Sequence, residues 1–258
     1  IMKVQELFNL NGKVALITGG SKGLGYIMAE GLAEAGADII LCSRNIDECK
    51  VAADNISKIG VKSKAYKCDV SDPDDVVEMV ESTILEFGKI DILINNAGYA
   101  TGGPLEDMTL EQWNKSFAVN STGPFLCCRE VGRQMIKQGG GKIINIASVA
   151  GMTTIAPELA DALSYSSSKA ALVFFTKDLA RKWCKYNINV NAIVPGYFST
   201  EMSKNVIEYR NKEMMNTILM KRLGEKEDLK GAALLLSSKA SDYMTGQIIA
   251  VDGGVLLS

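Results

Sequence analysis

The sequence predicts an α/β fold in which a doubly wound parallel sheet carries helices on both faces. Short apolar runs of strand length recur along the whole chain, at 14–18, 38–42, 62–67, 90–94, 142–147, 188–194 and 247–251. Stretches of helical length and composition lie between them, among them 26–36, 46–59, 73–87, 110–137 and 166–186. Strands that alternate with helices form a parallel sheet covered on both sides. We therefore expect the strand order 3-2-1-4-5-6, with a seventh strand at one edge.

Length, charge and cysteine usage narrow the class of protein. The 258 residues fit one domain spanning 1–258. A net charge of −2 from interspersed acids and bases gives no reason to expect nucleic acid or a membrane surface as a partner. No apolar run reaches the length of a membrane span, and the first residues lack a signal-peptide pattern. The six cysteines form no C-x-x-C pair, so we expect buried free thiols and a cytoplasmic location.

A glycine-rich turn follows the first predicted strand. The strand ends at Thr18, and residues 19–25 include four glycines before a predicted helix. Such a turn places a pyrophosphate on a helix N-terminus, because backbone N–H groups and the helix dipole favour an anion and glycines let it approach. The spacing is Gly-x3-Gly-x-Gly rather than the better-known Gly-x-Gly-x-x-Gly. A plain tight turn is the alternative interpretation.

A tyrosine and a lysine one helical turn apart are the candidate proton-transfer groups. The chain contains no histidine, so it lacks the commonest general base at neutral pH. Tyr165 and Lys169 are spaced i,i+4 and share one face of a predicted helix, so the ammonium can stabilise a phenolate. Ser148 follows a strand-like run upstream. Taken alone, the pair also fits a packed tyrosine beside a solvated lysine.

Together these motifs resemble the short-chain dehydrogenase/reductase family. The matches occur in order from 13 to 254 and cover nearly the whole chain. They comprise Thr18, Gly19, Gly23, Gly25, Asp69, Val70, Asn95 to Gly98, Asn120, Ser148, Tyr165, Lys169, Pro195, Gly196 and Thr200. Within the family, the start at 4–8 and the run at 247–254 look most like gluconate 5-dehydrogenase-like members. The resemblance implies a Rossmann-type fold and an oxidoreductase that moves a hydride between a nicotinamide and a secondary alcohol or ketone.

The resemblance also implies roles for individual residues. Tyr165 would transfer the proton, while Ser148 would hydrogen-bond the substrate oxygen. Lys169 would lower the pKa of the tyrosine and hold the nicotinamide ribose, and Asn120 would hold a water that relays protons to Lys169. The residues expected to bind the cofactor are Thr18, Gly19, Ser21, Lys22, Gly23, Leu24, Gly25, Ser43, Arg44, Asp69, Val70, Asn96, Ala97, Gly98, Tyr165, Lys169, Pro195, Gly196 and Thr200. No metal site is predicted.

The end of the second predicted strand indicates NADP rather than NAD. An NAD-preferring enzyme places an acid there, hydrogen-bonded to the ribose hydroxyls. This chain has Ser43 and Arg44 instead, and a guanidinium suits a 2′-phosphate. Lys22, inside the glycine turn, can approach the same phosphate. The alternative is that both cations are solvated surface residues.

The substrate is less well defined by the sequence. The 17 positions from Ser148 to Tyr165 exceed the family spacing, so the loops 149–164 and 197–223 are expected to form an individual pocket. Its methionines, Met202, Met214, Met215 and Met220, fit either an adaptable pocket or the core. A sugar acid such as 5-ketogluconate is one candidate substrate. A 3-oxoacyl-[acyl-carrier-protein] reductase using Arg133 and Arg181, a steroid or aliphatic ketone reductase, and a non-catalytic NADP-sensing regulator are the alternatives.

Two long predicted helices indicate self-association. Stretches 110–137 and 166–186 carry more large apolar residues than one sheet face obviously absorbs, namely Phe117, Phe125, Phe174, Phe175 and Trp183. The family resemblance implies a homotetramer with closed symmetry.

Overall fold

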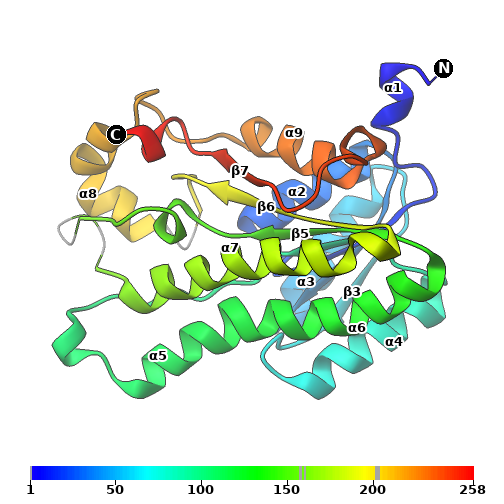
Figure 1. Ribbon diagram of the computed structural model, residues 1–258, viewed down its shortest axis with the longest axis horizontal. Helices are drawn as coiled ribbons and strands as arrows, with labels where there is room; N and C mark the ends of the chain where they lie inside the picture. Colours follow the sequence, from blue (N-terminus) through cyan, green and yellow to red (C-terminus); the bar gives the residue numbers. More distant parts are fainter. Residues whose placement is uncertain (1, 157–158, 160, 201–203) are drawn as a thin grey trace.

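The computed structural model describes residues 2–156, 159, 161–200 and 204–258, and it has the predicted α/β architecture (Figure 1). The described strands are all parallel, in the order β3-β2-β1-β4-β5-β6-β7. The predicted doubly wound order is therefore confirmed. The strands are β1 (Val14–Thr18), β2 (Asp38–Ser43), β3 (Ser63–Lys67), β4 (Ile92–Asn95), β5 (Gly141–Ile146), β6 (Ile188–Pro195) and β7 (Ile248–Val251).

Helices pack against both faces of the sheet. The α-helices are α1 (Val4–Leu7), α2 (Gly23–Glu34), α3 (Ile46–Ser57), α4 (Pro73–Phe87), α5 (Leu110–Phe117), α6 (Gly123–Gln138), α7 (Leu163–Trp183), α8 (Lys204–Thr217) and α9 (Lys226–Ser237). One apolar core joins α2, α3 and α9 to the sheet, and a second joins α4, α6 and α7 to the other face (Figure 1). None of the helices in the described ranges is long and apolar enough to cross a membrane.

The ends of α4 show how local sequence sets the elements. Asp72 precedes the helix, and its carboxylate accepts hydrogen bonds from the backbone N–H groups of Asp74 and Asp75. Pro73 opens the helix, where its missing N–H costs nothing. The helix ends at Gly88, whose φ of +79° is the left-handed conformation that favours glycine. The predicted helix 73–87 is confirmed to the residue.

The predicted helix 110–137 is interrupted near its middle. Between α5 and α6 the chain forms a π-helical segment, Ala118–Thr122, with Asn120 buried at its centre. The hydrophobic pattern alone predicts one continuous helix and does not indicate the wider turn. π-Helical segments inside α-helices are frequent at functional sites.

A third, smaller core lies at the end of the sheet where β6 and α8 meet. It contains Met214 and Ile218 of the 197–223 segment and Leu159 of the loop before α7. Met214 is fully buried and Met220 is 68% exposed, while Met202 lies outside the described residues. Five cysteines are buried as expected, and Cys184 is exposed.

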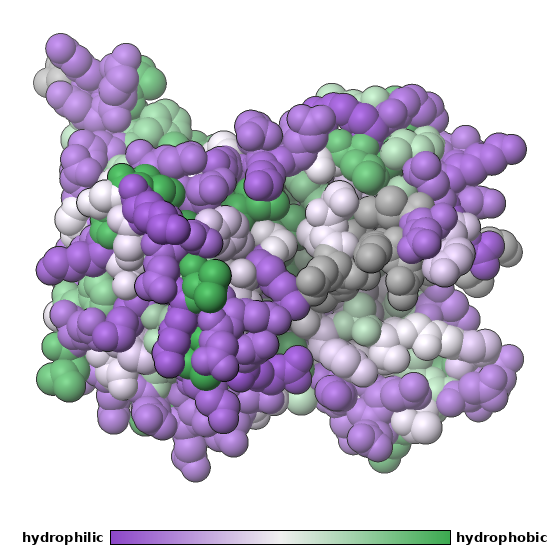
Figure 2. All heavy atoms as spheres, turned by 180° about the vertical axis from the view of Figure 1, so that it is seen from behind, coloured by the Kyte–Doolittle hydropathy of each residue, from purple (hydrophilic) through white to green (hydrophobic). Residues whose placement is uncertain are grey.

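The surface seen from behind is mostly hydrophilic (Figure 2). Its apolar side chains lie in small separate groups on this face rather than in one broad patch. On the face that carries α6 and α7, two aromatic side chains are exposed, Phe125 at 45% and Phe174 at 72%. Phe175 and Trp183, in contrast, pack against the core. The ring centroids of Phe117 and Trp113 lie 4.9 Å apart.

Candidate active site

The glycine turn after β1 brings the backbone into contact distance with the end of β4. Gly19 and Gly23 have φ of +62° and +58°, which other residues rarely adopt. A Cβ on Gly25 would lie 2.4 Å from the Nδ2 atom of Asn96, and one on Gly19 would lie 2.9 Å from the Cα atom of Ala97. Only glycine fits these positions.

Hydrogen bonds lock this turn to the segment after β4. The Thr18 hydroxyl accepts hydrogen bonds from the backbone N–H groups of Asn96 and Ala97, both at 3.0 Å. The Asn96 amide donates in return to the carbonyl oxygens of Thr18 and Gly19, both at 3.0 Å. A Cβ on Gly23 would lie 3.7 Å from the Thr200 methyl group, so Thr200 borders the same turn. The predicted cofactor residues of β1, β4 and the segment after β6 therefore meet.

The N-terminus of α2 fits a dinucleotide phosphate. The helix begins at Gly23, and its N-cap residue Lys22 provides no side-chain cap for the first backbone N–H groups. Amides of this kind, at the positive end of a helix and next to glycines, are suited to binding a phosphate. Ser21 and Leu24 are half-buried at the same turn.

Arg44 and Asp69 lie close together beyond β2 and β3. The Arg44 side chain is exposed, and the Ser43 hydroxyl donates to the carbonyl oxygen of Asn45 at 2.7 Å. Burial would raise the pKa of Asp69, but hydrogen bonds from Ser71 and the charges of Arg44 and Lys115 hold it below its usual value. Asp69, a predicted cofactor-binding residue, is thus a carboxylate close to the positive charges of Arg44 and Lys115.

Val70 follows Asp69 and packs against the start of α6. A Cβ on Gly123 would lie 2.8 Å from a Val70 methyl group, so glycine is needed for this approach. The contact fixes the segment after β3 against the helix that follows Asn120.

Tyr165 and Lys169 lie in the first turns of α7, with Ser148 at the end of the strand beside them. Lys169 is buried, and its ammonium donates to the carbonyl oxygen of Ile146 at 2.7 Å. It lies 5.8 Å from the centroid of the Tyr165 ring. Burial lowers the pKa of Lys169 to about 8. The lysine therefore begins to lose its charge in the weakly alkaline range.

The expected lowering of the tyrosine pKa by Lys169 is not what this structure shows. Burial raises the pKa of Tyr165, and its hydrogen bond with Ser148 opposes that rise. Desolvation is the larger of these two effects. The Ser148 hydroxyl therefore favours the phenolate in this structure, and the contribution of Lys169 stays a prediction.

Asn120 is held by three hydrogen bonds. Its Oδ1 atom accepts from the backbone N–H of Tyr99 at 2.8 Å, and its Nδ2 atom donates to the carbonyl oxygen of Tyr99 at 2.8 Å and to the Ser168 hydroxyl at 2.9 Å. A Cβ on Gly98 would lie 3.6 Å from this Oδ1 atom and 3.8 Å from the Lys169 ammonium. Asn120 and Lys169 thus flank Gly98, and the proton relay between them stays a prediction.

Pro195 and Gly196 end β6 against the last strand. The Gly196 N–H donates to the carbonyl oxygen of Val251 at 2.9 Å, and a Cβ on Gly196 would lie 2.7 Å from the Cα atom of Asp252. This close approach holds the predicted cofactor-binding residues at the end of β6 against β7 and the residue that follows it.

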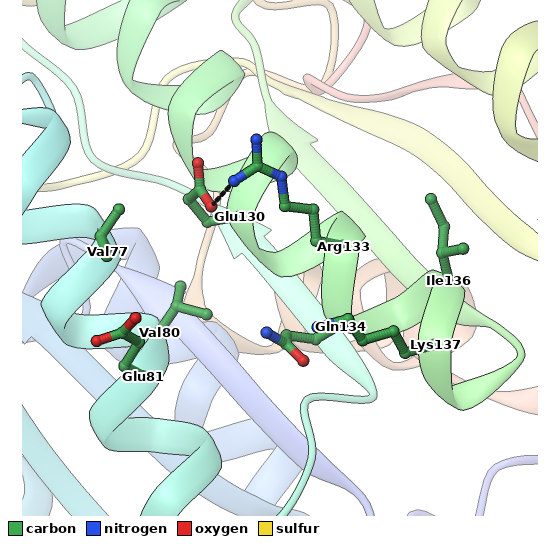
Figure 3. Close-up of a pocket in the computed structure, with 8 residues that line it drawn as sticks. All are labelled: Val77, Val80, Glu81, Glu130, Arg133, Gln134, Ile136 and Lys137. Carbon is green, nitrogen blue, oxygen red and sulfur yellow. Dashed lines mark hydrogen bonds and ion pairs between the residues drawn. The ribbon is translucent and has the colours of Figure 1, made fainter.

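Two surface hollows differ in their position relative to these groups: the first lies apart from them, and the second is lined in part by Val251 and Asp252, beside Gly196. One, of about 420 Å³ between α4 and α6, is lined by Val77, Val80, Glu81, Glu130, Arg133, Gln134, Ile136 and Lys137 (Figure 3). There Arg133 donates to Glu130 at 2.8 Å (Figure 3). The other, of about 320 Å³, borders Tyr197, Phe198 and Gly253. Neither hollow is lined by Ser148, Tyr165 or Lys169. The candidate site is therefore defined by the positions of these side chains and not by the size of a hollow.

Several residues of the site were missed at the sequence level. Tyr99 holds Asn120 through its backbone, and Ser168 bonds both Asn120 and the carbonyl oxygen of Tyr165. Ser168 belongs to the run between the candidate tyrosine and lysine, which was a usable signal. Its partner lies 48 positions away, and nothing in the sequence links the two.

Comparisons with known proteins identify the family. A family model described as enoyl-(acyl carrier protein) reductase matches residues 19–256. A 2-dehydro-3-deoxy-D-gluconate 5-dehydrogenase from Dickeya dadantii (strain 3937) is 43% identical over 258 residues, covering 98% of this chain and 99% of its own.

Solved structures of similar sequence and fold indicate the same family. A short-chain type dehydrogenase/reductase from Mycobacterium marinum is 39% identical, with a TM-score of 0.96 over 99% of this chain and 100% of its own. A gluconate 5-dehydrogenase from Burkholderia cenocepacia J2315, in complex with NADP and tartrate, is 34% identical, with a TM-score of 0.94 over 99% of this chain and 100% of its own.

A glycine turn leading into a helix, beside a tyrosine and lysine at the carboxyl ends of parallel strands, defines a dinucleotide-dependent oxidoreductase. The chain belongs to the short-chain dehydrogenase/reductase family. The predicted family and the likeness to gluconate 5-dehydrogenases are confirmed. It is an enzyme of the class that acts on CH–OH groups.

Proposed function

We propose that this protein is an NADP-dependent oxidoreductase that interconverts a secondary alcohol and a ketone on a sugar acid. The observation that carries the proposal is the placing of Tyr165 beside Ser148 and Lys169, at the rim where the glycine turn meets Asn96. The relatives named for gluconate derivatives support the substrate class.

When bound, the nicotinamide supplies or accepts the hydride. In ketone reduction the Ser148 hydroxyl donates a hydrogen bond to the carbonyl oxygen, and the Tyr165 hydroxyl gives that oxygen a proton. In alcohol oxidation the phenolate of Tyr165 takes the proton back. The Lys169 ammonium, fixed by the carbonyl oxygen of Ile146, stabilises the phenolate by charge. Asn120 fixes the backbone of Tyr99 beside them.

NADP is the cofactor, as in the solved relative that binds it. The exposed Arg44 of this chain would contact the 2′-phosphate, and Lys22 in the glycine turn would add a second positive charge. A guanidinium binds a phosphate with two parallel hydrogen bonds. The cofactor-binding residues named from the sequence are part of this proposal.

We further propose that 1–258 acts as one domain in the cytoplasm, with the loops 149–164 and 197–223 forming the substrate pocket. The exposed Phe125 and Phe174 on α6 and α7 support assembly into a homotetramer through these helices. Sedimentation at micromolar concentration tests the assembly, and a monomer would contradict it.

A substrate panel tests the function. NADPH oxidation is measured with 5-ketogluconate, a β-ketoester, a neutral ketose and an apolar ketone, and Tyr165→Phe serves as the inactive control. Fastest turnover with the sugar acid supports the proposal. Preference for the β-ketoester would favour a 3-oxoacyl-[acyl-carrier-protein] reductase. NADPH binding without turnover of any ketone would favour the NADP-sensing regulator.

A further inference from the structure

A buried pair of serine hydroxyls ties the beginning of α7 to α5. The Oγ atoms of Ser116 and Ser164 lie 2.9 Å apart, and both residues are fully buried. The Ser116 hydroxyl also donates to the carbonyl oxygen of Gln112 at 3.2 Å. Since a hydroxyl has one proton, Ser164 is the donor within the pair whenever Ser116 donates to Gln112.

A second link follows one helical turn later. The Asn120 amide donates to the Ser168 hydroxyl at 2.9 Å, and Ser168 donates to the carbonyl oxygen of Tyr165 at 2.7 Å. Both links join residues 48 positions apart in the chain. Such equal offsets mean that α7 runs alongside α5 and the π-helical segment in a fixed register.

The first turn of α7 lacks a side-chain cap of its own, so these hydrogen bonds to α5 and the π-helical segment stabilise it. The helix begins at Leu163, and its N-cap residue, Ala162, makes no side-chain hydrogen bond to the open N–H groups. Tyr165 is the third residue of this uncapped turn. Uncapped helix ends open more easily than helix centres.

The hydrogen bonds of Ser164 and Ser168 lie on the helix face next to the candidate catalytic pair. Ser164 and Ser168 are spaced i,i+4, one position before Tyr165 and Lys169, so the two pairs occupy neighbouring faces of α7. Fixing the serine face against α5 therefore fixes the direction in which the tyrosine hydroxyl points.

We propose that the Ser116–Ser164 pair is a positioning element that holds the Tyr165 hydroxyl in register with Ser148. The inference rests on the proposed role of Tyr165 in proton transfer. Neither serine touches substrate or cofactor in this role. Misplacing a reacting group by about 1 Å can cost about 10²-fold in rate.

The experiment compares Ser164→Ala, Ser116→Ala and the double variant with Ser166→Ala. Ser166 lies in the same turn, and its hydroxyl makes no hydrogen bond within the described part of the chain, so Ser166→Ala is the matched control. We expect kcat to fall about tenfold in Ser164→Ala, with ketone KM and NADPH Kd changed less than about twofold. The acidic limb of the pH profile for alcohol oxidation, where Tyr165 becomes protonated, should move to higher pH, because the hydrogen bond from Ser148 that lowers the tyrosine pKa weakens.

The double variant separates positioning from stability. Replacing both partners of a buried hydrogen bond by groups of similar shape restores much of the lost stability. We expect its Tm to approach that of the wild type while kcat stays low and the pH limb stays displaced. Recovery of both Tm and kcat in the double variant would overturn the inference, as would single variants that lose Tm but keep kcat and the pH profile.

Tyr165→Phe keeps this test separate from the proposed function. If that variant retains turnover, the proposed function itself is wrong. If it loses turnover while the serine variants keep theirs, only the positioning role is wrong.

Discussion

The glycine turn after β1 and the first turn of α7 bring groups to the same rim of the sheet by different means. The turn is shaped by backbone: positive φ at Gly19 and Gly23, and contacts at Gly25 that leave no room for a Cβ. The start of α7 is shaped by side chains that reach distant elements, such as Ser164 to α5. A phosphate needs amides at a fixed place, whereas proton transfer needs one hydroxyl aimed at one atom.

The difference predicts how each region responds to change. Substitutions in the turn should affect folding and cofactor affinity together, because the backbone itself is the binding surface. Substitutions at the start of α7 should affect turnover while cofactor binding persists.

The largest effect is expected from Tyr165→Phe. The substitution removes the transferable proton and keeps the ring, so kcat should fall at least about 10²-fold. NADPH affinity, set mainly by the glycine turn, should change little. Steady-state kinetics with NADPH titration by fluorescence measures both. Near-normal turnover would refute the mechanism. A parallel loss of NADPH binding would mean that the start of α7 contributes to cofactor binding as well as to turnover.

The next largest effect, a loss of NADPH affinity, is expected from Arg44→Ala. A hydrogen bond to a charged group contributes roughly 1.5–3 kcal/mol, so NADPH should bind about one to two decades more weakly. NADH lacks the 2′-phosphate and should be nearly unaffected. KM for both cofactors is compared in the wild type, Arg44→Ala and Lys50→Ala, which removes an exposed cation on the following helix. An equal loss for both cofactors would mean that Arg44 does not bind the phosphate.

The two regions also differ in how far the sequence alone predicts them. Strand order, the glycine turn and its helix followed from patterns of neighbouring residues, and the structure agrees with them. The π-helical segment at Asn120 and the serine pair depend on contacts between residues 48 positions apart, which no local pattern encodes. The raised pKa of Tyr165 is likewise beyond what the sequence predicts, since burial is a property of the folded chain.

A smaller effect is expected from Gly25→Ala. A Cβ there would lie 2.4 Å from both the Asn96 Nδ2 atom and the carbonyl oxygen of Gly19, so the turn must shift. We expect a loss of about 1–3 kcal/mol in the free energy of unfolding and weaker NADPH binding. Gly231→Ala is the matched control, because that glycine also lies in a helix but its Cβ would meet nothing within 4 Å. The control should gain about 0.5–1 kcal/mol.

Similar stability changes in the two glycine variants would contradict a steric requirement at the turn. A destabilised Gly25→Ala that binds NADPH normally would mean that the turn supports the fold but does not form the binding surface. Thermal unfolding and NADPH titration distinguish these outcomes.

The smallest expected change in stability, a gain rather than a loss, comes from Lys169→Met. Burial lowers the pKa of Lys169 to about 8, from 10.5. Between these values the unfolded chain binds more protons than the folded one, so this group adds stability as pH rises through the window and costs most below about 8. The methionine removes that cost, about 3 kcal/mol at pH 7, and loses the charged hydrogen bond to Ile146, which contributes about 1.5–3 kcal/mol. We expect a net gain of about 1 kcal/mol in the free energy of unfolding at pH 7, together with lost turnover.

The pH dependence of that gain is the decisive measurement. The stability difference between Lys169→Met and the wild type should shrink as pH rises from 8 towards 10.5, because the wild-type lysine becomes neutral in both states. Lys177→Met, at an exposed position on the same helix, should show no such change. A variant that is less stable than the wild type at pH 7, by an amount independent of pH, would mean that the buried ammonium is compensated in the folded protein. The start of α7 would then be a stabilised element, like the glycine turn, rather than one that gives up stability for catalysis.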